Sequence, residues 1–177
     1  ACADYRGYEV CGMGPPSSGA LTVGQILSIL SNYDIPAMGP GAGSTHLYLE
    51  AAKLAYADRG LYMADSDFVK MPEGILDATY LKSRAALIDP AKAMAKADAG
   101  TPPWKEASLL SPDTQLERPG TSHFSIVDAE GNVVSITTTI ETGFGSRVMS
   151  NGFLLNNELT DFSRAPEKDG KPIANRV

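Results

Sequence analysis

The first half of the chain carries the apolar repeat of amphipathic helices. Four apolar residues follow the i, i+3, i+4, i+7 spacing of one helix face: Val23, Ile26, Leu27 and Leu30. Ser44 is the expected N-cap of a second helix, and the predicted buried stripe of that helix is Leu47, Ala51, Leu54 and Ala55. The pattern also predicts a strand at 5–13 and two shorter helices, at 77–88 and 90–98.

A period of two replaces the helical period after residue 120. The preceding stretch, 100–119, contains four prolines and is predicted to be an exposed connector. The segment S-H-F-S-I-V-D then alternates between polar and apolar residues, and N-V-V-S-I-T-T-T-I-E is rich in β-branched residues. With the short A-E-G between them, these segments predict a β-hairpin within 122–140, and a further strand is expected near 152–157.

The turn of this hairpin predicts the register of its strands. A three-residue loop at 129–131 gives glycine the last loop position, where a left-handed backbone is needed. Asp128 then faces Asn132, and counting outward from that pair places Thr121 opposite Thr139. A four-residue loop would shift the register by one residue. Cross-strand threonine pairs are also ordinary structural devices, so the register alone assigns no chemistry.

Composition and charge exclude several classes of function. The 177 residues are 43% hydrophobic and 20% charged, as is usual for a globular domain. The net charge of −6 argues against binding of nucleic acid, which needs clustered Lys and Arg. No segment has the apolar length of a membrane span, and the first residues show no basic region followed by an apolar run, so no secretion signal is visible.

Cysteine and histidine are scarce. Cys2 and Cys11 lack C-x-x-C spacing and the only histidines are His46 and His123, which argues against a zinc site with Cys and His ligands. We expect two buried free thiols, with a disulfide in an oxidising compartment as the alternative. We expect no metal and no cofactor. So few histidines also disfavour Ser-His-Asp chemistry, so a nucleophile in this chain must find its base elsewhere.

Several motifs together resemble the γ-glutamyltranspeptidase family. They cover almost the whole chain in the family's order: D-Y-R-G-Y-E-V, P-P-S-S-G, A-Y-A-D-R-G-L-Y, the block T-S-H-F-S-I-V-D-A-E-G-N-V-V-S-I-T-T-T-I-E, F-G-S and G-F-L-L-N-N-E-L-T-D-F-S. The resemblance implies an N-terminal-nucleophile hydrolase whose precursor cuts itself before a threonine. The matching bond joins Gly120 to Thr121.

The resemblance also implies a domain organisation and a fold. Residues 1–120 would form the end of a large subunit and 121–177 the beginning of a small one, within one structural domain. The expected fold class is α+β, as part of a four-layer αββα sandwich. Residence in the periplasm or outside the cell is what the family suggests.

Threonine chemistry fits the shortage of histidine. A threonine hydroxyl needs a base to become a nucleophile, and cleavage before Thr121 would create one, the freed α-amine. By resemblance, Thr121 attacks the γ-glutamyl amide of glutathione or a related donor. The γ-glutamyl ester then passes to water or to an amino-acid or peptide acceptor. Thr139 matches the threonine that positions the nucleophile.

Three acidic residues match the family positions that bind the α-amino group of the donor: Glu141, Glu158 and Asp161. Several carboxylate acceptors orient an ammonium group strongly. Some family members have Asn in place of Glu141 and Gln in place of Glu158. Glu141 as a plain strand-end carboxylate and Asp161 as a cap are the simpler alternatives. We expect Asn156 and Asn157 to fix the loop, and His123 to be structural or to aid processing.

Other parts of the family's active site have no match in these residues. The arginine and the serine pair that bind the substrate carboxylate, and the glycine pair of the oxyanion hole, belong before Ala1 and after Val177. The rest of both subunits is therefore the expected partner, and the chain alone is expected to be inactive. Two alternatives stay open: an acylase of the same superfamily that acts on glutaryl groups of cephalosporin derivatives, and a non-catalytic structural relative.

Overall fold

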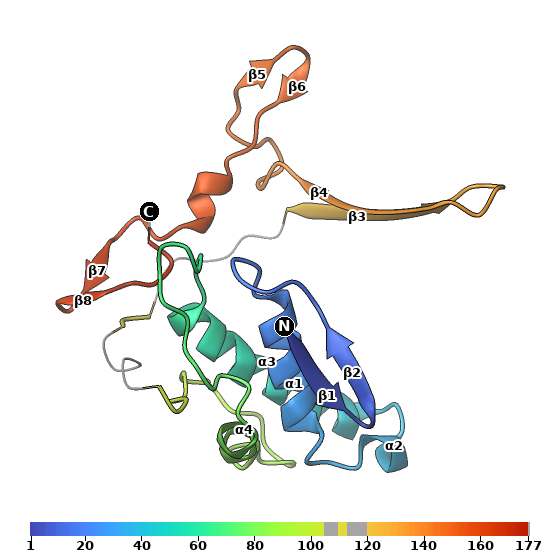
Figure 1. The fold of residues 1–177 in the computed structure, drawn as a ribbon, viewed down its shortest axis with the longest axis vertical. Helices are drawn as coiled ribbons and strands as arrows, with labels where there is room; N and C mark the ends of the chain where they lie inside the picture. Colours follow the sequence, from blue (N-terminus) through green and yellow to red (C-terminus); the bar gives the residue numbers. More distant parts are fainter. Residues whose placement is uncertain (105–109, 113–119, 177) are drawn as a thin grey trace. The chain divides into compact units, whose positions relative to one another are not determined.

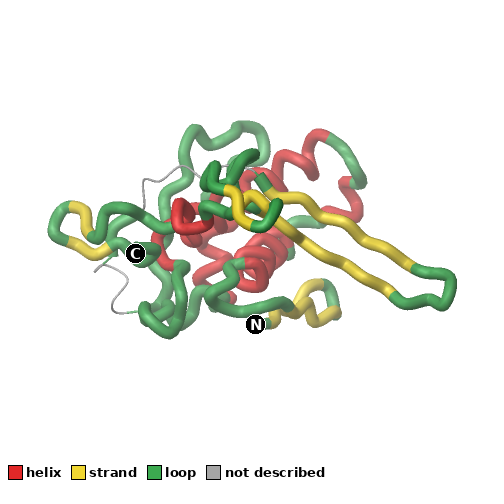
Figure 2. Tube along the Cα trace, turned by 90° about the horizontal axis from the view of Figure 1, so that it is seen from above, coloured by secondary structure: helices red, strands yellow, loops and turns green. Residues whose placement is uncertain are grey.

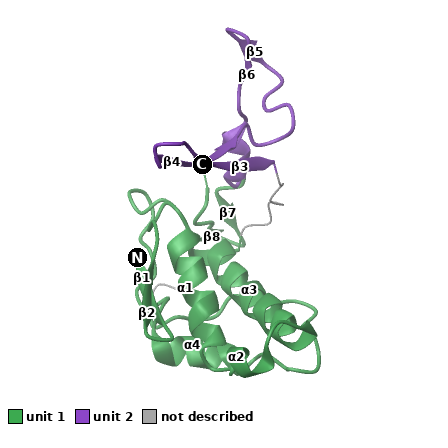
Figure 3. Cartoon of the chain, turned by 90° about the vertical axis from the view of Figure 1, so that its right-hand side faces the viewer, with its two compact units in different colours: residues 1–113, 165–176 green, residues 114–164, 177 purple. Residues whose placement is uncertain are grey.

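The computed structural model describes residues 1–104, 110–112 and 120–176. Their contacts divide the chain into two compact units, 1–113 with 165–176, and 114–164 (Figure 3). The division arises because the strands of the long hairpin pair with one another, and the expectation of one structural domain stays a prediction. The predicted subunit boundary at 120 concerns a backbone bond, which a grouping by contacts does not test. The secondary structure is mixed helix and strand, in agreement with the expected fold class.

In the described part of the first unit the α-helices are α1 (Gly19–Leu30), α2 (Ile35–Met38), α3 (Ala42–Tyr62) and α4 (Ala78–Ala85). α1 lies beside α3 and α4 (Figure 1). The predicted stripe of α3 is confirmed, because Leu47, Ala51, Leu54 and Ala55 are all buried. The stripe of α1 is partly wrong: Ile26 and Leu30 are buried, but Val23 is exposed, and Gln25 and Ile29 take the buried positions.

Ser44 caps α3 from inside the helix. The N-cap is Gly41, three residues earlier than predicted. The Ser44 hydroxyl accepts a hydrogen bond from the Gly41 amide at 3.1 Å and donates to the Gly39 carbonyl at 2.7 Å. The serine therefore satisfies one of the free amides at the helix start, as a capping side chain does.

A hairpin replaces the single strand predicted at 5–13. β1 (Cys2–Tyr5) pairs antiparallel with β2 (Tyr8–Cys11). The two turn residues have positive φ, 54° at Arg6 and 85° at Gly7, as a two-residue hairpin turn with primed geometry requires. This register places Cys2 opposite Cys11, with Cα atoms 4.1 Å apart, and they form a disulfide. The prediction of buried free thiols is therefore wrong.

The predicted helix at 90–98 is absent. The backbone there forms a turn and a bridge between Asp89 and Lys92. It bonds to α3: the Met94 amide donates to Glu50 at 2.8 Å and Lys53 donates to the Met94 carbonyl at 3.0 Å. The predicted connector also begins differently, since Pro102 and Trp104 are buried. Residues 105–109 and 113–119 of that connector lie outside the described part.

A buried carboxylate joins α1, α3 and α4. Asp58, only 1% exposed, accepts hydrogen bonds from Gln25 at 2.8 Å, Tyr80 at 2.6 Å and the Gly100 amide at 2.7 Å. Arg84 lies 3.2 Å from the same carboxylate. Burial and the Asp58 carboxylate raise the pKa of Tyr80, so its phenol stays protonated and donates. The network ties three helices to the residues that precede Trp104.

The second unit is built on a long hairpin. β3 (Thr121–Val127) and β4 (Val133–Thr139) run antiparallel as a two-stranded ribbon (Figure 2). The predicted register is confirmed: Thr121 pairs with Thr139, the Asp128 amide donates to the Asn132 carbonyl, and Gly131 has a φ of 86°.

Two short strand pairs and a 3₁₀ turn complete the described elements. β5 (Met149–Ser150) pairs with β6 (Phe153–Leu154), near the predicted strand, and a 3₁₀ turn follows at Glu158–Asp161. β7 (Glu167–Lys168) pairs with β8 (Lys171–Pro172) in the first unit, where the Ser111 hydroxyl donates to the Lys168 carbonyl. Among the described residues, every sheet therefore has two strands. No described helix has the length and apolar character to cross a membrane.

Candidate active site

The predicted nucleophile and its partner lie at the open end of the long hairpin. Thr121 is the first residue of β3, and Thr139, directly opposite, is the last residue of β4. The Thr139 hydroxyl donates to the Gly120 carbonyl at 3.1 Å and accepts from the Glu141 amide at 2.8 Å. One hydroxyl thus connects the carbonyl of the predicted processing bond with the loop that carries the first predicted binding residue.

The backbone at this end is crowded and strained. A Cβ built on Gly120 would collide with the Glu141 carbonyl, so only glycine fits. Glu141 itself has a φ of 74°, in the left-handed region that few residue types other than Gly and Asn adopt. Such a backbone costs on the order of 1–3 kcal/mol and persists only where its surroundings enforce it. Here the amide of Glu141 is held by Thr139.

The three predicted acidic residues lie close together. Glu141 is 6% exposed; its Oε1 accepts from the Thr160 hydroxyl at 3.3 Å, whereas its Oε2 is buried with no partner among the described residues. Oε1 of Glu158 is likewise buried without a described partner. The charge of the Asp161 carboxylate is close enough to Glu158 to affect its ionisation. Glu141 and Glu158 therefore each have one buried acceptor oxygen with no donor among the described residues.

The proximity of these carboxyl groups changes how readily they ionise. Burial first, then the negative charges of Asp161 and Glu141, raise the pKa of Glu158 above its ordinary value. A cation placed among the three groups would reverse both effects, because it would supply a donor and an opposite charge. The cluster has the chemistry of a site for a small ammonium group.

The loop residues hold this cluster, as predicted for the two asparagines. Oδ1 of Asn157 accepts from the Thr142 amide at 3.2 Å and from the Thr142 hydroxyl at 3.1 Å. Its Nδ2 donates to the Thr160 hydroxyl at 3.0 Å. Oδ1 of Asn156 accepts from the Glu158 amide at 3.1 Å. Sequence reasoning missed Thr142 and Thr160, which carry no signal apart from standing next to the acids.

His123 is engaged along the hairpin. Its Nδ1 is 2.8 Å from the Thr137 hydroxyl, and its Nε2 is 3.2 Å from the Ser135 hydroxyl and 3.3 Å from that of Ser125. Both ring nitrogens are thus occupied by hydroxyls of the same polar face. This arrangement agrees with a structural role and leaves Thr121 without an imidazole base from this residue.

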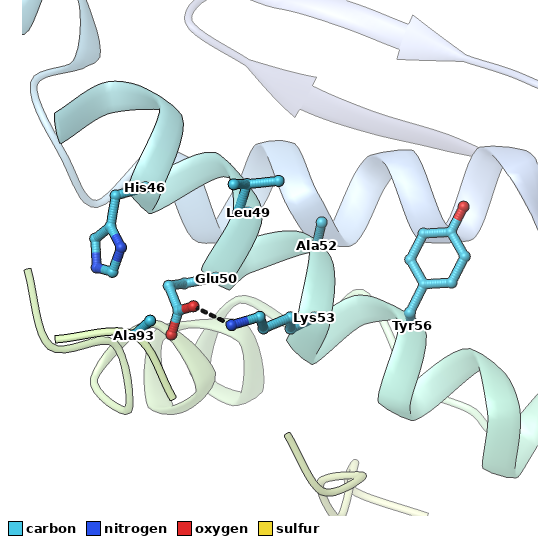
Figure 4. Close-up of a pocket in the computed structure, with 7 residues that line it drawn as sticks. All are labelled: His46, Leu49, Glu50, Ala52, Lys53, Tyr56 and Ala93. Atoms are coloured by element: carbon cyan, nitrogen blue, oxygen red, sulfur yellow. Dashed lines mark hydrogen bonds and ion pairs between the residues drawn. The ribbon is translucent and has the colours of Figure 1, made fainter. Parts of the chain in front are cut away.

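A cavity of about 380 Å³ lies elsewhere, on α3 (Figure 4). Its lining includes His46, Glu50, Lys53 and Tyr56. It contains none of the catalytic, substrate-binding or processing residues predicted from the sequence. Burial opposes ionisation of Glu50, yet hydrogen bonds from Lys53 and the Met94 amide hold the pKa of this carboxyl below its ordinary value. The charges of Glu50 and Lys53 in this cavity are therefore paired with each other.

Comparisons with known proteins agree with the motifs. The family profile described as gamma-glutamyltranspeptidase matches residues 1–177. A glutathione hydrolase proenzyme of Escherichia coli (strain K12) is 44% identical over 167 residues, which cover 92% of this chain and 27% of that protein. The Acylase ACY 1 proenzyme of Pseudomonas sp. (strain V22) is 41% identical over 166 residues, with the same two coverages.

A solved structure shows the same likeness. The crystal structure of Helicobacter pylori gamma-glutamyltranspeptidase matches with a TM-score of 0.52 and 35% identity, over 63% of this chain and 30% of that chain. The chain therefore belongs to the gamma-glutamyltranspeptidase family. It spans 27% of the length of the curated relatives named above.

Proposed function

We propose that the protein containing this chain is a γ-glutamyltransferase and glutathione hydrolase that is activated by cleavage between Gly120 and Thr121. The observation that carries this proposal is the pair of buried carboxylate oxygens without described partners, on Glu141 and Glu158, beside the Thr139 end of the hairpin. A buried carboxylate oxygen without a donor is costly. The α-ammonium group of a γ-glutamyl donor would supply the missing hydrogen bonds.

Cleavage begins with the hydroxyl of Thr121. The Thr121 oxygen attacks the Gly120 carbonyl, the C–N bond breaks, and an ester joins Gly120 to the threonine hydroxyl while the α-amine is released. Water then hydrolyses the ester, leaving a carboxylate on Gly120 and a free amino terminus on Thr121. The Thr139 hydroxyl, which donates to the Gly120 carbonyl, stabilises the charge that develops on that oxygen.

Turnover uses the same hydroxyl. The α-amine of Thr121 takes the hydroxyl proton, and its reference pKa of about 7.7–8.0 leaves a useful neutral fraction near neutral pH. The oxygen attacks the γ-carbonyl of the donor, and the amine of the donor leaves with a proton. Glu141, Glu158 and Asp161 hold the α-ammonium group. Water or an acceptor amine resolves the γ-glutamyl ester.

The remaining expectations belong to the same proposal. Residues 1–120 end the large subunit and 121–177 begin the small one, in an αββα sandwich completed by the rest of the protein. Because the chain matches 27% of the curated relatives named above, we expect it alone not to release p-nitroaniline from a γ-glutamyl anilide. A periplasmic or extracellular location is proposed from the family alone.

Mass spectrometry of the full-length protein tests the cleavage. The expected result is two chains, one of which starts at Thr121, and a single uncut chain for Thr121→Ala. A single chain in the unmodified protein would favour the non-catalytic alternative.

The acylase alternative is distinguished by substrate. Two of the matched relatives bear an acylase name, and a glutaryl group lacks the α-amine of a γ-glutamyl group. We expect γ-glutamyl amides to be hydrolysed faster than glutaryl amides, and Glu158→Gln to slow only the γ-glutamyl reaction. Faster glutaryl hydrolysis, unchanged in Glu158→Gln, would contradict the assignment of the acidic cluster.

A further inference from the structure

The outer face of the first hairpin gathers thiol and carboxylate groups. Cys2 pairs with Cys11, and Asp4 pairs with Glu9, two positions further toward the turn. Since side chains alternate along a strand, these four residues share one face. All four are exposed. The sequence argued against zinc because it lacks C-x-x-C spacing, but the hairpin register brings the cysteines together instead.

Breaking the disulfide would leave two thiols and a carboxylate close enough to share one tetrahedral ion. The two Sγ atoms and a carboxylate oxygen of Glu9 all lie within 4.8 Å of one another. Zinc binds thiolates at about 2.3 Å and carboxylates at about 2.0–2.2 Å, so two thiolates on one ion are about 3.8 Å apart. Once the disulfide is reduced, rotation of the side chains is enough to reach this geometry.

The hairpin has an anchor that does not depend on the disulfide. Its inner face packs on α1, where the position of a Cβ on Gly24 would lie 3.1 Å from Cβ of Ala3. Tyr5 packs against the main buried cluster of the helices. The strands therefore keep their neighbours after reduction, and the four outer side chains stay on one face.

We propose that the reduced hairpin binds a zinc-class divalent ion through the thiolates of Cys2 and Cys11 and the carboxylate of Glu9. Asp4 or water takes the fourth position. The disulfide form has no thiolate to offer, so oxidation closes the site. Reduction requires two equivalents of a low-molecular-weight thiol, which end as its disulfide while Cys2 and Cys11 each gain an electron and a proton. The ion then displaces both thiol protons.

Titration of the reduced full-length protein with Co²⁺ and then Zn²⁺, without oxygen, tests the site. The expected result is one equivalent of Co²⁺ with a thiolate-to-cobalt charge-transfer absorption that Zn²⁺ removes. The disulfide form and the Cys2→Ser/Cys11→Ser variant are expected to lack this absorption. If the reduced protein shows no more thiolate absorption than the double variant, the proposal is wrong.

A second pair of variants isolates the carboxylate while keeping both cysteines. Glu9→Gln is expected to weaken Zn²⁺ binding at least about tenfold, as loss of an ion's supporting groups typically does. Glu167→Gln, which changes an exposed glutamate in another hairpin, β7–β8, is the matched control and is expected to bind unchanged. Equal affinities for Glu9→Gln and Glu167→Gln would remove Glu9 from the site. No γ-glutamyl turnover is measured, so the outcome is independent of the proposed function.

Discussion

Replacing Asp58 by asparagine is expected to be among the most damaging single changes in the first unit. The substitution keeps the size of the side chain but removes its charge and turns one acceptor oxygen into a donor. That oxygen accepts from Tyr80 at 2.6 Å and from Gln25 at 2.8 Å. Both donors would then face an NH₂ group, and the buried Arg84 would lose its counter-ion.

The magnitude follows from these contacts. Each hydrogen bond to a charged group contributes about 1.5–3 kcal/mol, and removing one partner of a buried ion pair costs about 3–5 kcal/mol. We therefore expect Asp58→Asn to lower the free energy of unfolding by about 4 kcal/mol, a large share of the 5–15 kcal/mol typical of a domain. With a urea slope of about 2 kcal/mol per molar, the midpoint falls by about 2 M.

Urea unfolding followed by tryptophan fluorescence measures this loss. Trp104 is the single tryptophan of the chain, is buried in the first unit and packs edge-on against Tyr62. The matched control is Asp98→Asn, because Asp98 is 80% exposed in an ion pair with Lys96 that is 81% exposed. Such a surface pair contributes about 0–1 kcal/mol.

A double variant checks the physical reason. Adding Arg84→Met to Asp58→Asn removes the unpaired charge, so the double change is expected to cost at least about 1 kcal/mol less than the sum of the single changes. If Asp58→Asn costs no more than Asp98→Asn, or if the two effects simply add, the account of a charge-paired network around Asp58 is refuted.

Three further predictions concern the processing bond, the acidic cluster and the first hairpin. Gly120→Ala places a methyl group against the Glu141 carbonyl and is expected to slow cleavage of the full-length protein at least about tenfold; a normal rate by gel electrophoresis would contradict this. Because the pKa of Glu158 is raised by burial and neighbouring carboxylates, its contribution to stability is complete below the ordinary glutamate pKa and is lost as pH rises through the raised value. A glutamine side chain cannot ionise, so the Glu158→Gln variant should not lose this stability at higher pH. The urea midpoint of the variant should therefore exceed that of the unmodified protein by most near neutral pH. An equally large difference in acid would contradict the expected direction of the pH dependence. Reducing the disulfide, whose cysteines are nine positions apart, is expected to cost about 2.6 kcal/mol from loop closure, measured as a lower melting temperature, and no change on reduction would contradict it.

Local patterns predicted the elements whose geometry is set locally. The register of β3 and β4 follows from the loop at 129–131, because glycine stands where a left-handed backbone is needed. The stripe of α3 follows from apolar spacing in a long helix. Both depend on residues within one element or one turn.

Errors arose where a distant or unusual contact decides the structure. The turn of the first hairpin uses Arg6 in a left-handed conformation, which its residue type does not indicate, and the disulfide could not be predicted without that turn. The segment at 90–98 is not helical, and Glu50 and Lys53 of α3, far away in the sequence, bond to its backbone. The acidic residues of the candidate site came from family resemblance, whereas their mutual distance depends on loops that no periodicity encodes.

The loop at 129–131 sets the position of the proposed nucleophile across the whole length of the hairpin. Seven paired positions separate it from Thr121, about 23 Å at the usual rise along a strand. Inserting or deleting one residue there would slide every pair, place a different residue opposite Thr121 and turn one strand's alternate side chains to the other face. A change in an exposed loop, far from any reacting atom, would thus misalign the hydroxyls at the other end. Tolerance to loop-length variation, usual at hairpin tips, is therefore not expected here.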